Sequence, residues 1–168
     1  MTESYEIRPF DPGDIKSVVM INQQCLPENY PEQFFLGLYH HAPKAFFVVQ
    51  DGDRVVGYIM CRIERGISGF GRLPTKKGHI VSVAVLQDSR NRGMGRELIS
   101  SAMEGMKGYG ASEFFLEVRK TNEAAIGVYE KLGFSVKRVL RGYYRDGEDA
   151  YLMAKKVGES EVEDDSDD

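Results

Sequence analysis

Apolar and polar residues alternate over short runs in several parts of the chain, and this pattern predicts β-strands. The runs are rich in β-branched and aromatic residues and are bounded by turn residues. The clearest example is a hairpin, in which residues 44–50 (KAFFVVQ) and 54–64 (RVVGYIMCRIE) flank an Asp-Gly turn. The other predicted strands cover residues 4–10, 78–86 and 112–119, with two more inside 134–157.

Other segments repeat their apolar residues with the period of a helix. In the clearest of them, apolar residues recur at four-residue intervals at Met94, Leu98, Ala102 and Met106. Asp11 or Asp14 and Asn122 can cap helices, and Pro31 can open one. The predicted helices cover residues 14–26, 31–41, 95–110 and 122–133, and residues 65–77, with four Gly or Pro, are predicted to be a surface loop.

The order of these elements indicates an α/β fold. Hairpins lie near both ends and strand–helix–strand units lie between them, which favours a mixed sheet. The length of 168 residues suits one domain. We therefore expect a single domain over residues 1–157, with a mixed central sheet of about seven strands flanked by about four helices.

Charge is distributed unevenly along the chain. The formal net charge is −4, but residues 158–168 hold seven of the 26 acids and no base. Residues 1–157 then carry 22 bases against 19 acids, a net charge of +3. An acidic segment with few apolar residues cannot form a core, so the sequence predicts a disordered tail over 158–168.

The composition also argues against several classes of protein. No apolar run approaches the roughly 20 residues of a membrane span, and the N-terminus lacks a secretory signal pattern. Cys25 and Cys61 lack metal-ligand spacing, so we expect reduced thiols and no dedicated metal site. No basic stripe with interleaved aromatic residues suggests nucleic-acid binding. These features predict a cytoplasmic protein that binds neither membrane nor nucleic acid.

The segment Arg90–Gly95 (RNRGMG) lies between a predicted strand and a predicted helix. Glycines let backbone N–H groups approach a ligand closely, and the N-terminus of a helix attracts anions. The segment therefore suits a phosphate group, although an ordinary strand–helix turn with solvated arginines remains an alternative. It matches neither the Walker pattern nor a dinucleotide-binding fingerprint.

Two motifs in this order resemble the GCN5-related N-acetyltransferase superfamily. Arg90, Gly93 and Gly95 are similar to its Arg/Gln-x-x-Gly-x-Gly/Ala signature. The second motif, Asn-x-x-Ala-x-x-x-Tyr-x-x-x-Gly-Phe, is matched by Asn122, Ala125, Tyr129, Gly133 and Phe134. The segments CLPENY, GHIVSVAV and YYRDGEDAYLM narrow the resemblance to the archaeal Ard1-type N-terminal acetyltransferases, the catalytic subunits of the A type. This resemblance covers about Tyr5 to Val157.

The resemblance implies three residues that take part in the reaction. His79 and Glu117 would help to remove a proton from the attacking amine. A structural histidine is an alternative for His79, whereas a carboxylate inside the apolar strand at Glu117 is harder to explain by packing. Tyr129 would meet the sulfur of coenzyme A, although a tyrosine on a helix is often only part of the core.

The resemblance also implies binding residues for acetyl-CoA and for a peptide. Its pyrophosphate would bind N–H groups of the loop, and its pantetheine would bind the backbone of the preceding strand. Acetyl-CoA is thus expected at Val83, Ala84, Val85, Arg90, Asn91, Arg92, Gly93, Met94, Gly95, Arg96, Asn122 and Tyr129. The first residues of the peptide are expected at Glu28, Tyr30, Tyr143 and Tyr144, although the last two could belong to a simple hairpin with a turn at Asp146-Gly147.

The function implied is transfer of acetyl from acetyl-CoA to the free α-amine of protein N-termini, of the Ser, Ala or Met type, in a ternary complex. Its partners would be nascent or completed proteins, with ribosome proximity. The alternatives are an enzyme for one ribosomal protein, for lysine or for a small amine, and a non-catalytic module that binds coenzyme A.

Overall fold

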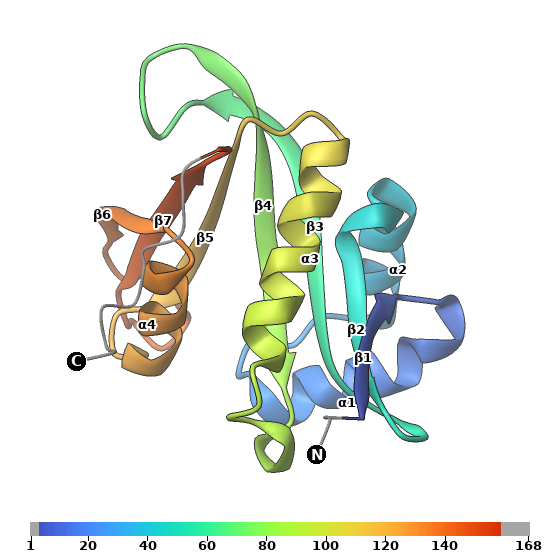
Figure 1. Ribbon diagram of the computed structural model, residues 1–168. Helices are drawn as coiled ribbons and strands as arrows, with labels where there is room; N and C mark the ends of the chain where they lie inside the picture. The colour runs from blue at the N-terminus through green and yellow to red at the C-terminus, as the bar shows by residue number, and fades with distance from the viewer. Residues whose placement is uncertain (1–3, 159–168) are drawn as a thin grey trace, which may run out of the picture. The chain divides into compact units, whose positions relative to one another are not determined.

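The structure is a computed structural model that describes residues 4–158 (Figure 1). It holds a seven-stranded sheet with the order β1-β2-β3-β4-β5-β7-β6 and the four helices α1 to α4. This is the mixed α/β architecture that the sequence predicts. The chain divides into two compact units: unit 1 runs to Ile63 and includes Ile80–Gly110, and unit 2 holds Glu64–His79 and the chain from Ala111 on. Each unit is described by itself.

Unit 1 begins with antiparallel strands. β1 (Tyr5–Pro9) pairs with β2 (Phe46–Asp51), and β2 pairs with β3 (Arg54–Ile67). The turn between β2 and β3 contains Gly52 at φ 64°, as an Asp-Gly hairpin turn requires. The last residues of β4 (Pro74–Val85) complete the sheet of this unit.

Three helices cover the sheet of unit 1. α3 (Met94–Gly108) packs against β1 and β2 on the face turned to the viewer in Figure 1, and α1 (Ile15–Cys25) and α2 (Glu32–His41) lie behind the sheet. The four-residue repeat of α3 faces inward, because its members are all buried: Met94, Leu98, Ala102 and Met106. The predicted apolar stripe is therefore part of the core.

Gly105 marks the closest approach in unit 1. It lies on α3 opposite the short 3-10 helix Pro43–Ala45. A Cβ atom at this position would lie 2.0 Å from the carbonyl oxygen of Lys44 and 2.9 Å from its carbonyl carbon. Only glycine lets the two backbones meet at this distance.

Unit 2 is built around a parallel pair of strands. The first part of β4 runs parallel to β5 (Glu113–Arg119), with His79 opposite Phe115. β5 then pairs antiparallel with β7 (Ala150–Lys156), which also pairs with β6 (Ser135–Leu140). α4 (Glu123–Lys131) connects β5 to β6, and the buried ammonium of Lys155 on β7 donates to the carbonyl of Leu132 just after this helix.

Most predicted elements are confirmed, but the loop predicted over residues 65–77 is wrong in extent. β3 continues to Ile67 and β4 already begins at Pro74, so only residues 68–73 connect them. The glycine and proline residues that suggest a loop are compatible with strand ends here, because β3 and β4 are neighbours in the sheet and pair through their backbones. The connection of β6 to β7 is also longer than a two-residue hairpin turn at Asp146-Gly147, because it spans residues 141–149. A tight turn does lie within it, since the N–H of Gly147 donates to the carbonyl of Tyr144 at 2.9 Å and the N–H of Tyr144 donates to the carbonyl of Glu148 at 3.1 Å.

Three further predictions concern the thiols, the tail and the membrane. Cys25 and Cys61 are both free thiols, and burial raises the pKa of the Cys61 thiol. The acidic segment 159–168 lies outside the described residues. Within residues 4–158, every helix is too short or too polar to cross a membrane.

Candidate functional site

The loop before α3 in unit 1 has a left-handed backbone at two positions. Asn91 has φ 66° and Gly93 has φ 82°. Gly93 is the N-cap of α3, and since it has no side chain, it does not cap the first N–H groups of the helix. A Cβ added at Gly95 would meet no atom within 4 Å. This open helix start carries a partial positive charge and suits an anion such as a pyrophosphate.

Two arginines of this loop hold its shape. Arg90 donates from Nε to the carbonyl of Val85 at 2.8 Å. Arg92 pairs with Asp51 at 2.8 Å, and the carbonyl of Arg92 accepts a hydrogen bond from the hydroxyl of Tyr5 at 3.0 Å. The sequence suggests that these charges help to attract the anion. Their contacts give both arginines a structural role as well, and their interaction with an anion stays a prediction.

The strand residues Val83, Ala84 and Val85 lie at the end of β4 in unit 1. Ala84 and Val85 are buried, while Val83 is partly exposed. The carbonyl of Val85 already accepts the hydrogen bond from Arg90, and the thiol of Cys25 lies 3.6 Å from the same oxygen. Backbone groups near Val83 are therefore better placed than the Val85 carbonyl to bind a pantetheine amide.

His79 and Glu117 meet in unit 2. Nε2 of His79 lies 2.7 Å from Oε2 of Glu117, on the neighbouring strand β5. The two side chains are only 11% and 16% exposed. The contact follows from the register of the sheet, because His79 is opposite Phe115, and Glu117, two residues further, shares a face with it. The buried carboxylate thus has the partner that its position demands.

Sequence reasoning missed a second carboxylate at this histidine. Oε2 of Glu64, at the end of β3 that belongs to unit 2, lies 2.9 Å from Nδ1 of His79. This is a close charge contact rather than a directional hydrogen bond. The alternation of residues along the strand places Glu64 on the same face as Arg62. It does not show which residues of the next strand lie opposite them.

Tyr129 lies on α4, and Asn122 lies just before the first residue of this helix. Tyr129 is buried, and this burial raises its pKa to about 12. Its ring packs edge-on against Phe134 at 6.0 Å. The side chain of Asn122 accepts a hydrogen bond from the backbone N–H of Ala125 at 3.2 Å, so Asn122 is the N-cap of this helix. The Tyr129 hydroxyl is thus a neutral donor over the whole physiological pH range.

The segment with Glu28 and Tyr30 in unit 1 is held by a buried residue that sequence reasoning missed. Asn22 on α1 is fully buried, and its side chain donates to the carbonyl of Glu28 at 3.0 Å and accepts from the backbone N–H of Tyr30 at 3.2 Å. Asn22 also contacts the hydroxyl of Tyr58, which is hydrogen-bonded to Ser82 on β4. A buried amide with all these partners fixes the connection between α1 and α2.

Tyr143 and Tyr144 lie in the connection between β6 and β7 of unit 2. Their rings meet edge to face at 5.0 Å, and the guanidinium of Arg119 lies 4.0 Å from the ring centroid of Tyr144. Arg119 also pairs with Asp146 at 2.9 Å and Glu148 at 2.6 Å. Hydrogen bonds from Thr121 and Arg119 lower the pKa of Glu148. These contacts make the connection a defined loop that presents two tyrosines.

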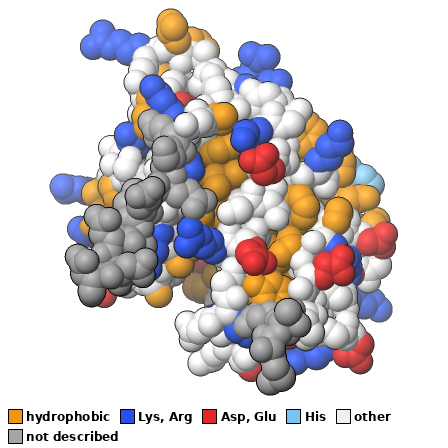
Figure 2. Space-filling model, in the orientation of Figure 1, with side chains coloured by type: hydrophobic (Ala, Val, Ile, Leu, Met, Phe, Trp, Pro, Cys, Tyr) orange, Lys and Arg blue, Asp and Glu red, His pale blue; other side chains and the backbone are white. Residues whose placement is uncertain are grey.

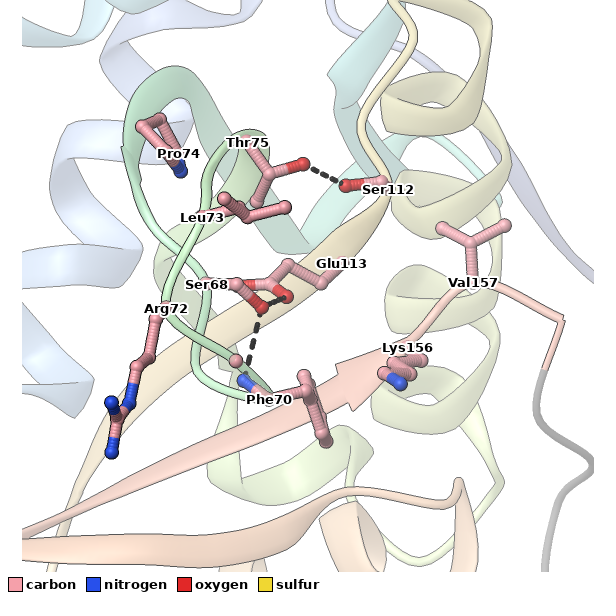
Figure 3. A pocket seen from close by; sticks show the side chains of 11 residues that line it. Ser68, Phe70, Arg72, Leu73, Pro74, Thr75, Ser112, Glu113, Lys156 and Val157 are labelled. Atoms are coloured by element: carbon pink, nitrogen blue, oxygen red, sulfur yellow. Dashed lines mark hydrogen bonds between the residues drawn. The ribbon is translucent and has the colours of Figure 1, made fainter.

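Unit 2 also contains an open cavity of about 440 Å³, shown in Figure 3. Glu113 lies in it, and its carboxylate accepts hydrogen bonds from the Ser68 hydroxyl at 2.6 Å and the Gly69 N–H at 2.8 Å. This carboxylate anchors the connection between β3 and β4, and none of the predicted site residues lines the cavity. Its lining comprises Ser68, Phe70, Gly71, Arg72, Leu73, Pro74, Thr75, Ser112, Glu113, Lys156 and Val157.

Neither the distribution of charged side chains nor the arrangement of His, Cys, Asp and Glu indicates another kind of site in the described part of the chain. On the face shown in Figure 2, lysine and arginine side chains lie scattered, with acidic side chains between some of them. Among residues 4–158, no group of three or more His, Cys, Asp or Glu could hold a metal ion.

Comparison with known proteins identifies the relatives of this chain. Residues 15–134 match the acetyltransferase (GNAT) family. An N-alpha-acetyltransferase of Sulfurisphaera tokodaii is 50% identical over 155 residues, which cover 90% of this chain and 93% of that protein. The crystal structure of Ard1 from Thermoplasma volcanium is 33% identical and covers 93% of this chain and 99% of its own, with a TM-score of 0.80.

A third similar structure has a ligand named in its description. Naa20 of Chaetomium thermophilum, in complex with a bisubstrate analogue, is 32% identical, with a TM-score of 0.79. The match covers 90% of this chain and 86% of that one. The similarity to these proteins extends over nearly all of the described residues.

Proposed function

This chain belongs to the acetyltransferase (GNAT) family, and we propose that it transfers acetyl from acetyl-CoA to the free α-amine of protein N-termini. The observation that carries the proposal is the 50% identity to an N-alpha-acetyltransferase over nearly the full length of both chains. The buried pair of His79 and Glu117 supplies a base for such a reaction. Residues 1–157 form the acetyltransferase domain in this proposal.

The first task of the protein is to remove a proton from the substrate. An α-amine has an ordinary pKa of about 7.7–8.0, so near neutral pH most of it is an ammonium ion that cannot attack. In our proposal, Glu117 and Nε2 of His79 accept this proton, directly or through one water molecule, and pass it to solvent. The electron pair of the broken N–H bond stays on nitrogen, which then attacks the thioester carbonyl.

The second task is to bind acetyl-CoA and to receive its thiolate. Acetyl-CoA supplies the activated acetyl group, and cleavage of its C–S bond leaves a thiolate. The open start of α3 fits the pyrophosphate, with contacts from N–H groups between Arg92 and Arg96. The Tyr129 hydroxyl, which is neutral at physiological pH, can protonate or hydrogen-bond the thiolate.

The third task is to hold the first residues of a peptide. We propose that Glu28, Tyr30, Tyr143 and Tyr144 contact this segment. Asn22 fixes the first pair and Arg119 fixes the second, so both sets of side chains are presented by ordered connections. The enzyme would act in the cytoplasm on nascent or completed proteins, close to the ribosome, as an acetyltransferase of the A type.

The proposal is tested by acetylation of a peptide set with free N-termini varied at positions one and two. We expect turnover of peptides that begin with Ser, Ala or Met, and little turnover of N-blocked peptides with lysine or of small amines. Turnover of a small amine alone would contradict the proposal. A Glu117→Gln variant that binds coenzyme A and keeps full acetyl transfer would contradict the assignment of Glu117 as the base, and a wild type that binds coenzyme A without acetylating any amine would support a non-catalytic module.

A further inference from the structure

His79 lies between two carboxylates, of which the proposed function uses one. Oε2 of Glu117 is 2.7 Å from Nε2, and Oε2 of Glu64 is 2.9 Å from Nδ1. Each of the three residues comes from a different strand, β5, β4 and β3, and all of them belong to unit 2. Every nitrogen of the ring therefore has a carboxylate oxygen within hydrogen-bonding distance.

The imidazole ring has little freedom to turn away from this arrangement. Its face stacks on the ring of Phe115, with centroids 4.3 Å apart and an angle of 7° between the planes. The whole residue is only 8% exposed. Packing fixes the ring plane, and the two carboxylates fix which edge points toward β3 and which toward β5.

The position of the hydrogen on the His79 ring then depends on Glu64. A neutral imidazole carries hydrogen on one nitrogen only, while an ionised carboxylate can only accept. A lone pair on Nδ1 would face the buried oxygen of Glu64 at 2.9 Å, which is repulsive, whereas an N–H there is attracted. The same preference at Nε2 is met once the proton taken from the substrate is shared between His79 and Glu117, whose atoms lie 2.7 Å apart.

We propose that Glu64 is a positioning residue, which keeps a hydrogen on Nδ1 of His79 so that the exchangeable proton lies between Nε2 and Glu117. This proposal rests on the proposed function, since it assigns the proton taken from the α-ammonium to that contact. Lys77, on the same strand as His79, directs its ammonium at the Phe115 ring, 4.5 Å from the centroid, and toward Glu113 at 3.8 Å.

The first test is nitrogen-15 NMR of the protein labelled at histidine, which shows directly which ring nitrogen carries hydrogen. The chain has three histidines, and a His79→Asn variant assigns the signal. We expect hydrogen on Nδ1 of His79 in the wild type, whether or not Nε2 is also protonated. In Glu64→Leu, which removes the acceptor, we expect Nδ1 to lose its hydrogen in favour of Nε2. Glu64→Gln keeps an oxygen that attracts a hydrogen on Nδ1, but its NH2 group can also face an Nδ1 lone pair, so we expect hydrogen on Nδ1 in a larger share of molecules than in Glu64→Leu and a smaller share than in the wild type.

The second test is steady-state kinetics of peptide acetylation by the same variants. Loss of an orienting carboxylate beside a functional histidine typically costs about 10- to 100-fold in activity, and we expect this loss in kcat of Glu64→Leu. KM for peptide and acetyl-CoA should stay close to the wild-type value, because Glu64 holds neither substrate in this proposal. Glu64→Gln should lose less than about fivefold in kcat. Glu6→Leu, which removes an exposed carboxylate from β1, is the matched control and should keep wild-type kinetics.

The outcomes separate this inference from the proposed function. A wild-type ring without hydrogen on Nδ1, or a folded Glu64→Leu variant that keeps both the tautomer and kcat, would overturn the role of Glu64. Equal losses in Glu64→Leu and Glu64→Gln would also overturn it, because the amide retains the acceptor. If Glu64→Leu does not fold, the wild-type and Glu64→Gln spectra still decide whether Glu64 determines which ring nitrogen of His79 carries the hydrogen. A wild type that acetylates no peptide α-amine would contradict the proposed function, and the NMR result would stand independently.

Discussion

Gly105 offers a sharp test of the packing of α3 in unit 1. In the interior of an exposed helix, Gly→Ala normally stabilises a protein by about 0.5–1 kcal/mol. At Gly105 the new Cβ would lie 2.0 Å from the Lys44 carbonyl oxygen, far inside the 3.4 Å at which ordinary contacts begin. Both atoms belong to backbones that other contacts hold, including the hydrogen bond from the Lys44 N–H to the Tyr109 hydroxyl at 2.9 Å. The helix or the 3-10 helix must therefore move by more than an ångström.

Overpacking of this kind costs about 1–3 kcal/mol, which outweighs the gain in helix propensity. We expect Gly105→Ala to lower the free energy of unfolding by about 2 kcal/mol, and Tm by about 4–8 °C for a chain of this size. Gly37→Ala is the matched control, since Gly37 lies in the middle of α2 and a Cβ added there would meet no atom within 4 Å. It should raise stability by about 0.5–1 kcal/mol. Chemical and thermal denaturation measure both changes, and a Gly105→Ala protein as stable as Gly37→Ala would refute the reasoning.

Two further predictions concern the loop at the start of α3 and two buried tyrosines. Gly95→Val should raise KM for acetyl-CoA more than Arg96→Ala does, because a branched side chain blocks the backbone donors that the anion needs, and equal changes in initial-rate measurements would contradict this account. Tyr58 and Tyr129 each have a pKa raised to about 12 by burial, against about 10 in the unfolded chain. Their contribution to stability is complete below pH 10 and is lost as the pH rises toward 12, so absorbance titration should show tyrosines that ionise late, and Tyr129→Phe should remove one of them.

Local chemistry explains how much of the site the sequence can predict. Gly93 is recognisable because a turn before a helix requires a residue that tolerates positive φ, and it has φ 82°. Asn122 is recognisable as a cap from its position before an apolar repeat. The alternation of β5 predicts that Glu117 is unusual in an apolar strand. All three inferences depend on neighbours within a few residues.

The residues that sequence reasoning misses depend on contacts between distant segments. Glu64 and His79 both lie in predicted strands, but they meet only because β3 lies beside β4, and no short-range pattern gives the register of these two strands. Asn22 resembles any polar residue on a helix until its partners Glu28, Tyr30 and Tyr58 surround it. Arg92 is similar: only the structure shows that its charge is matched by Asp51.

The central claim is that the acetyl group goes to the α-amine of a peptide. The most direct measurement uses acetyl-CoA and one peptide that has a free Ser or Ala N-terminus and an internal lysine, followed by mass spectrometry to locate the acetyl group. Our account predicts one acetyl group per peptide, located on the first residue. Acetylation of the lysine with the N-terminus left free would contradict it.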